Sequence, residues 1–96
     1  NRKTKKKTIP IVRINPRYPR QALLNGIEGY VRLEFTILED GSVKDVVVAE
    51  SRPGQVFDRS AVLAVMKWKF KPRIIDGEAV PRRATSTVEF VLDENE

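Results

Sequence analysis

One stretch of the sequence decides the fold: Tyr30-Val31-Arg32-Leu33-Glu34-Phe35-Thr36-Ile37, followed after one residue by Glu39-Asp40-Gly41-Ser42. Every second side chain from Val31 to Ile37 is apolar, which places these residues on one face of a strand. A strand with one apolar and one polar face is typical of an antiparallel sheet with one side in water. Asp-Gly between apolar runs is a strong hairpin signal, because both residue types tolerate a positive φ. We therefore predict a β-hairpin centred on this turn.

The return strand is expected over residues 43–51. Val43 is out of step with Val46 and Val48, and a bulge near Asp45 would explain the change of phase. Upstream, three prolines indicate that residues 9–19 are extended, because proline disfavours helix in the residue before it. A short helix then follows from Pro19, which suits a first helical turn, to Gly26, which suits a left-handed helix end.

The second helix is predicted from about Asp58 to Lys67. Its apolar residues fall at helical spacing, and Pro72 prevents its continuation; they are Phe57, Ala61, Ala64, Val65 and Trp68. The exit from this helix alternates over residues 68–71, so we expect Trp68 and Phe70 to point into the core. Asp76-Gly77 indicates a further turn, and the last strand is expected over residues 82–92.

The predicted order is helix, strand, strand, helix, strand. Such an order favours an α+β fold, a small three-stranded antiparallel sheet with two helices packed on one face. A three-stranded sheet has two edges, and we expect the last strand to form one of them.

Composition excludes several classes of function. The 96 residues include no Cys and no His, so thiol, imidazole and disulfide chemistry is absent and we predict neither an enzyme nor a cofactor. The acidic residues around the first hairpin lack the six-oxygen spacing of a calcium loop. The longest apolar run, residues 61–66, is far shorter than the roughly 20 residues that span a bilayer. Any membrane anchor is therefore expected outside this sequence.

The net charge of +5 is concentrated at the start of the chain. Residues 1–7 hold five basic and no acidic side chains, and the remaining 89 residues carry 13 of each sign. The basic start is interpreted as a solvated linker end; contact with an anionic polymer is the alternative. Lysines also alternate with Trp68 and Phe70, a pattern that can bind single-stranded nucleic acid. Because the alternation puts the two aromatic residues on the face opposite the lysines, we predict no nucleic-acid partner.

Tyr18 lies between Pro16 and Pro19 in the extended segment. A tyrosine held between prolines can serve as a rigid contact surface. It can equally form a lid that packs onto the sheet. The sequence pattern leaves both interpretations open.

An ordered set of residues over about residues 14–92 resembles the C-terminal domain of TonB family proteins. No single motif in it is decisive, whereas the full set is specific. It comprises Tyr18-Pro19, Ala22, Gly26, Glu28-Gly29, Val31, Phe35, Asp40-Gly41, Val43, Ser51, Phe57-Asp58, Ala61, Ala64, Trp68 and Phe70-Lys71-Pro72.

This resemblance implies a non-enzymatic energy transducer. Members have an inner-membrane helix, a Pro-rich periplasmic spacer and this terminal domain, which binds the TonB box peptide of outer-membrane receptors. Their partners ExbB and ExbD, reached through the missing N-terminal part, supply work from the proton gradient for uptake of siderophores, haem or vitamin B12, with no small-molecule substrate bound by the domain itself. Residues 1–8 would then be the basic end of a periplasmic linker and residues 9–96 the domain of an inner-membrane-anchored protein.

The resemblance also implies where the receptor peptide binds. It would add a strand to the last strand, whose polar, proline-free stretch suits a solvated edge. The segment before Tyr-Pro, which lies near the peptide in the family, usually reads Gln-Pro-Gln, and here Arg17 replaces a neutral residue. The alternative is a TolA-like or other periplasmic domain that binds envelope proteins. The implied peptide-binding residues are Asn15, Pro16, Arg17, Tyr18, Pro19, Arg83, Ala84, Thr85, Ser86, Thr87, Val88 and Glu89.

Overall fold

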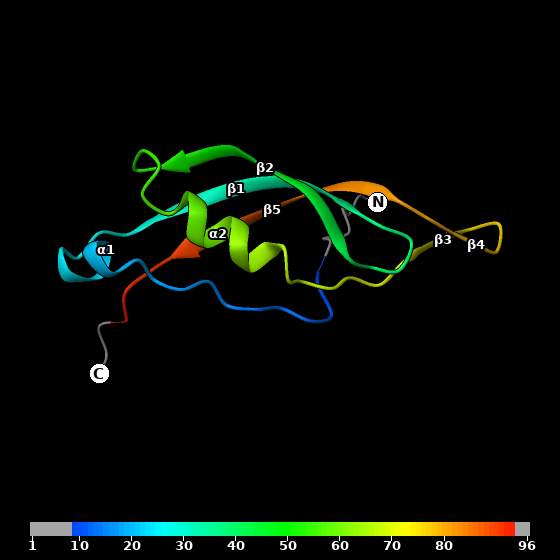
Figure 1. The fold of residues 1–96 in the computed structure, drawn as a ribbon, viewed down its shortest axis with the longest axis horizontal. Helices are drawn as coiled ribbons and strands as arrows, with labels where there is room; N and C mark the ends of the chain where they lie inside the picture. Colours follow the sequence, from blue (N-terminus) through cyan, green and yellow to red (C-terminus); the bar gives the residue numbers. More distant parts are fainter. Residues whose placement is uncertain (1–8, 94–96) are drawn as a thin grey trace, which may run out of the picture.

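A three-stranded antiparallel sheet organises the molecule, seen in a computed structural model that describes residues 9–93 (Figure 1). Its strand order is β2-β1-β5, so the last strand lies at an edge, as predicted. A separate two-stranded hairpin, β3-β4, extends beyond one end of this sheet (Figure 1). The predicted α+β fold is confirmed. The elements are α1 (Arg20–Leu24), β1 (Gly29–Ile37), β2 (Val43–Arg52), α2 (Asp58–Val65), β3 (Arg73–Ile75), β4 (Glu78–Val80) and β5 (Arg82–Phe90).

The hairpin between β1 and β2 turns on Gly41. Its amide donates to the Leu38 carbonyl at 2.9 Å, and the Leu38 amide donates to the Ser42 carbonyl at 2.8 Å. Gly41 has φ +89°, and a Cβ built on it would lie 2.0 Å from the Phe70 carbonyl oxygen. Only glycine satisfies both demands, because it tolerates positive φ and has no Cβ. The predicted turn is confirmed, with the positive φ at Gly41 rather than at Asp40.

β2 is irregular, whereas the pairing of β1 with β5 is not. The register of β1 with β2 shifts between Glu34 and Thr36, opposite Asp45, which has φ 56° and confirms the predicted bulge. It shifts again between Arg32 and Leu33. The extra residues lie in β2, since β1 pairs with β5 without interruption from Gly29 to Ile37.

The core lies between the sheet and α2. The whole predicted apolar stripe of α2 is buried, and Trp68 and Phe70 are buried as well, at 0% and 2% exposure. The inward face of β1 is at most 1% exposed from Val31 to Ile37. Ala22 of α1 joins the same core, so both helices are held by tertiary packing rather than by their own length.

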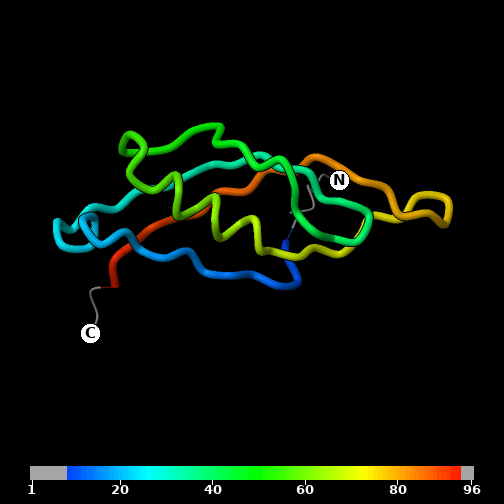
Figure 2. Tube along the Cα trace, viewed as in Figure 1, coloured from blue at the N-terminus to red at the C-terminus, as the bar shows by residue number. Residues whose placement is uncertain are grey.

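The extended N-terminal segment runs alongside α2 (Figure 2). Val12 pairs with Lys69, and the Trp68 indole nitrogen Nε1 donates to the Ile14 carbonyl at 2.9 Å. Further along, the Ser60 hydroxyl of α2 donates to the Arg17 carbonyl. These bonds fix the segment against the helix without any regular secondary structure.

The β3-β4 hairpin was not predicted beyond its Asp76-Gly77 turn. Both turn residues have positive φ, 52° and 82°, as a two-residue hairpin turn requires. The two strands have three residues each, and none of their side chains is fully buried. Such short strands produce no alternating pattern in the sequence. In residues 9–93 no helix has the length and apolarity to cross a bilayer.

Candidate functional site

Within residues 9–93 no strand pairs with the outer edge of β5, and this free edge is the first candidate surface. In a regular antiparallel strand, the N–H and C=O of one residue point to the same side and those of the next residue to the other side. Leu38 directs its amide to β2, so the even-numbered residues of β1 face β2 and the odd-numbered ones face β5. Odd β1 residues such as Leu33 pair with even β5 residues such as Ser86. The amides of Arg83, Thr85, Thr87 and Glu89 therefore point away from the sheet.

The end of the same chain segment supports this assignment independently. The Leu92 amide, at an even position just beyond β5, donates to the Glu28 carboxylate at 2.8 Å. Glu28 directly precedes β1, so an even-numbered amide again points toward β1. The backbone amides of the odd-numbered residues therefore point away from the sheet along the whole of β5.

The side chains of β5 alternate with the same period. Arg83, Thr85, Thr87 and Glu89 are exposed, whereas Val88 is 0% exposed and packs in the core. A docked strand would thus meet the backbone of the odd residues and no part of the Val88 side chain. Ala84 and Ser86 are half-buried on the inner face.

Arg83 is held across the outer face of the sheet. Its guanidinium donates to the Thr36 hydroxyl at 3.0 Å and to the Asp45 carbonyl at 3.2 Å. It also lies 3.9 Å from the Glu34 carboxylate. These exposed contacts fix the first outward residue of β5, although each ion pair at the surface contributes little stability.

The opposite edge of the sheet is a poorer surface for pairing. β2 contains two register shifts, and Asp45 at the first has a left-handed backbone. Bulges interrupt the ladder of free amides and twist the strand, which is how natural proteins protect an edge. The sheet thus has one regular edge and one irregular edge.

Tyr18 packs onto the sheet, which decides between the two interpretations left open above. Its hydroxyl donates to the Ile27 carbonyl, and its ring contacts Phe57 and Phe90 edge to face at 5.6 and 5.8 Å. Partial burial, and then the nearby charge of Glu28, raise the pKa of the Tyr18 hydroxyl above its ordinary value. Tyr18 is thus a lid over the core.

The rest of the Asn15–Pro19 segment lies beside α2, where the Ser60 hydroxyl donates to the Arg17 carbonyl. Tyr18 contacts Phe90, at the end of β5, and this ring contact joins the two predicted segments. Between the segment and α2 is an open hollow of about 480 Å³, lined by Arg17 and Pro19 on one side and by Leu63 on the other. Sequence reasoning missed the contribution of α2, because its exposed residues gave no signal beyond ordinary helix polarity.

The aromatic residues between the lysines do not form a nucleic-acid surface. Trp68 is fully buried, with Phe70 at 6.2 Å between ring centroids, and Arg13 covers its ring at 4.8 Å. Stacking of bases needs exposed rings. Within the described residues, no three acidic side chains gather closely enough to hold a metal ion.

The fold and its edge define a small α+β domain with an open antiparallel sheet. Residues 14–92 match the family described as Gram-negative bacterial TonB protein C-terminal. The chain therefore belongs to the TonB family and represents its C-terminal domain.

Relatives in sequence and structure agree. The chain is 45% identical over 78 residues to protein TonB of Pseudomonas aeruginosa and 36% identical over 80 residues to protein TonB of Vibrio cholerae. These matches cover 81% and 83% of this chain but only 23% and 33% of the relatives, so the chain spans at most about a third of their length.

Solved structures extend the agreement to the fold. The solution NMR structure of the Pseudomonas aeruginosa TonB C-terminal domain superposes with a TM-score of 0.77 at 39% identity, covering 96% of this chain and 93% of that one. The TonB2 protein of Vibrio anguillarum gives a TM-score of 0.69 at 38% identity, with 98% and 90% covered.

Proposed function

We propose that this domain binds the TonB box of outer-membrane receptors by adding the peptide as a strand to β5. The observation that carries the proposal is the regular free edge, where Arg83, Thr85, Thr87 and Glu89 each offer one outward N–H and one outward C=O. Peptide addition to an exposed edge draws its affinity from the main chain and leaves the sequence of the partner largely free. That suits a domain that serves several receptors.

The small number of outward N–H and C=O groups on β5 fits a partner that binds weakly and must be released. A hydrogen bond contributes about 1 kcal/mol net, because it replaces bonds to water. A few such bonds give weak and reversible capture. In the complete protein, ExbB and ExbD would supply work from the proton gradient, and the captured receptor would import a siderophore, haem or vitamin B12.

The same proposal places the domain in the periplasm, on a protein anchored in the inner membrane. Residues 1–8, which lie outside the described part of the chain, would be the basic end of its linker. The neutral charge balance of residues 8–96 supports a separable linker, because it leaves the excess charge entirely on residues 1–7. Asn15–Pro19 would flank the bound peptide at the Phe90 end of β5, where Tyr18 already lies.

Proline substitutions at alternate positions test the strand addition. Thr85→Pro and Thr87→Pro remove outward amides, so both variants should stay folded and bind a TonB-box peptide about tenfold or more weakly. Thr85→Val and Thr87→Val retain the amide and should bind as the wild type does. Ser86→Pro removes a bond to β1 and should unfold the domain.

Isothermal titration calorimetry measures the affinity, and circular dichroism melting shows which variants fold. A chain that lacks residues 1–7 is the control for the linker and should bind with unchanged affinity. If the folded Thr85→Pro and Thr87→Pro variants bound at wild-type affinity, strand addition at β5 would be excluded.

A further inference from the structure

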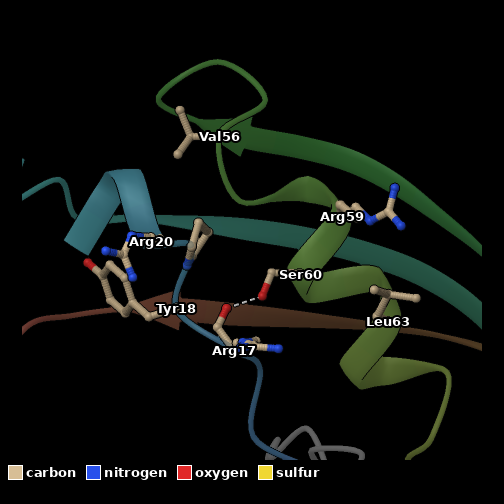
Figure 3. Close-up of a pocket in the computed structure, with 8 residues that line it drawn as sticks. Arg17, Tyr18, Arg20, Val56, Arg59, Ser60 and Leu63 are labelled. Atoms are coloured by element: carbon tan, nitrogen blue, oxygen red, sulfur yellow. Dashed lines mark hydrogen bonds between the residues drawn. The ribbon is translucent and has the colours of Figure 1, made fainter. Parts of the chain in front are cut away.

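A groove runs between the extended N-terminal segment and α2, and none of the outward residues of β5 lines it. The groove consists of two hollows, of about 480 and about 240 Å³. Both hollows are lined by Arg17, Ser60 and Leu63. Figure 3 shows Arg17, Tyr18 and Arg20 on one side and Val56, Arg59, Ser60 and Leu63 on the other.

The groove is preformed. The hydrogen bond from the Ser60 hydroxyl to the Arg17 carbonyl crosses it and joins its walls (Figure 3). The Trp68 indole fixes the Ile14 carbonyl at the far end at 2.9 Å. A ligand therefore needs to order little of the protein on binding, which lowers the entropic cost of association.

The charge around the groove has one sign. Its two hollows are lined by four cationic side chains and no carboxylate: Arg17, Arg20, Arg59 and Lys67. The ion pairs found within residues 9–93 use other arginines, so these four cations have no carboxylate within 4.0 Å there. Because residues 8–96 are neutral overall, this is a local concentration of charge. Such a surface attracts anions.

The walls between these cations are apolar. Leu63 and Val56 are 49% and 43% exposed, and Pro19 of the N-terminal segment lines the same hollow. A small anion would leave this apolar surface in water. A peptide with an apolar side chain among acidic ones would cover it and also approach the four cations.

We propose that this groove is a second docking site, for an acidic peptide segment that carries a large apolar side chain. Carboxylates of the segment lie against Arg17, Arg20 and Arg59, and its apolar side chain covers Leu63. The site does not require strand addition at β5, because no outward residue of β5 lines it, although it shares Arg17 and Pro19 with the segment proposed to flank the TonB box.

The full 96-residue chain, labelled with ¹⁵N, tests the proposal by NMR titration with the blocked peptide Glu-Asp-Leu-Leu-Asp-Glu. The amide signals of Arg17, Ser60 and Leu63 should shift. The same peptide with lysine in place of every acid should leave them unchanged. Equal shifts with the lysine peptide, or with inorganic phosphate at the same concentration, would overturn the proposal.

Paired variants separate charge from apolar contact. Arg59→Glu should weaken binding about fivefold, as expected for reversing one exposed charge, whereas Arg73→Glu on β3 should change it less than about twofold. Leu63→Ser should weaken binding about tenfold through lost apolar burial, and the similarly exposed Met66→Ser, outside the groove, should not. Unchanged affinity in both groove variants would contradict the site.

A final arm distinguishes this site from the proposed function. Thr87→Pro, which is designed to abolish strand addition, should bind the acidic peptide as the wild type does. Loss of acidic-peptide binding in this folded variant would show that the groove is not a separate site. Failure of TonB-box binding at β5 would leave the groove result untouched.

Discussion

Replacing Trp68 by alanine should strongly destabilise the domain. The indole is 0% exposed, packs against Phe70 and donates to the Ile14 carbonyl at 2.9 Å. Truncation of a buried aromatic residue costs about 3–5 kcal/mol, because transfer energy is lost and a cavity remains. A domain of this size has a free energy of unfolding of about 5–14 kcal/mol. Trp68→Ala should therefore lose from about a quarter to nearly all of the free energy of unfolding, depending on where in this range the wild type lies.

Trp68→Phe separates the hydrogen bond from the packing. Phenylalanine keeps an aromatic ring in the core and removes the donor to Ile14. The expected loss is about 1–3 kcal/mol, the cost of leaving a partly buried acceptor without its partner together with a small change of volume. Because Ile14 lines the groove beside α2, this variant should also broaden the NMR signals of the N-terminal segment.

Urea denaturation followed by far-ultraviolet circular dichroism measures both losses, since Trp68 is the only tryptophan and fluorescence would vanish with it. Met66→Ala is the matched control on the same helix end; its side chain is 54% exposed, and the change should stay within about 0.5 kcal/mol. A loss below about 1 kcal/mol for Trp68→Ala would refute the buried position and restore the indole as a contact surface.

Three further substitutions test the turns and the outer face of the sheet. Gly41→Ala should lower the free energy of unfolding by more than about 2 kcal/mol, because its Cβ would meet the Phe70 carbonyl, whereas Gly77→Ala, also at positive φ but in open space, should cost about 1 kcal/mol in thermal melts. The Tyr30 hydroxyl, bonded to Glu50 at 2.8 Å, lowers the pKa of the Glu50 carboxyl below its ordinary value. The ionised carboxylate therefore stabilises the fold above its ordinary pKa, and this stabilisation is lost as the pH falls through the pKa of the folded state. Glu50→Gln should accordingly reduce the loss of stability between about pH 5 and pH 3 in urea titrations, and an unchanged slope would contradict this role.

The parts of the fold that the sequence predicted depend on local patterns. β1 was evident because Val31 to Ile37 alternate, and α2 because its stripe keeps helical spacing up to Trp68. The bulge at Asp45 was also predicted, since a phase change in β2 is visible among its valines. In each case the spacing of apolar residues that are close in sequence predicts which face of the element is buried.

What the sequence left open depends on contacts between distant residues. Tyr18 could be a lid or a contact surface until its ring was placed against Phe90. Which amides of β5 point outward follows from the pairing of β5 with β1. Side-chain alternation alone does not reveal this pairing. The groove beside α2 joins Arg17 to Ser60, which are 43 positions apart. Neither residue carries a local signal for the other.

The unequal edges of the sheet set a limit on self-association. Two copies that paired through β5 would use both regular edges and leave only the two bulged β2 strands outside. Such an assembly is closed by its two-fold symmetry, because a bulged strand is a poor template for a further one. A chain with two regular edges would instead polymerise into an open ribbon. The irregular β2 therefore confines edge pairing to a single event, in which the receptor peptide proposed above and a second copy would compete for the same strand.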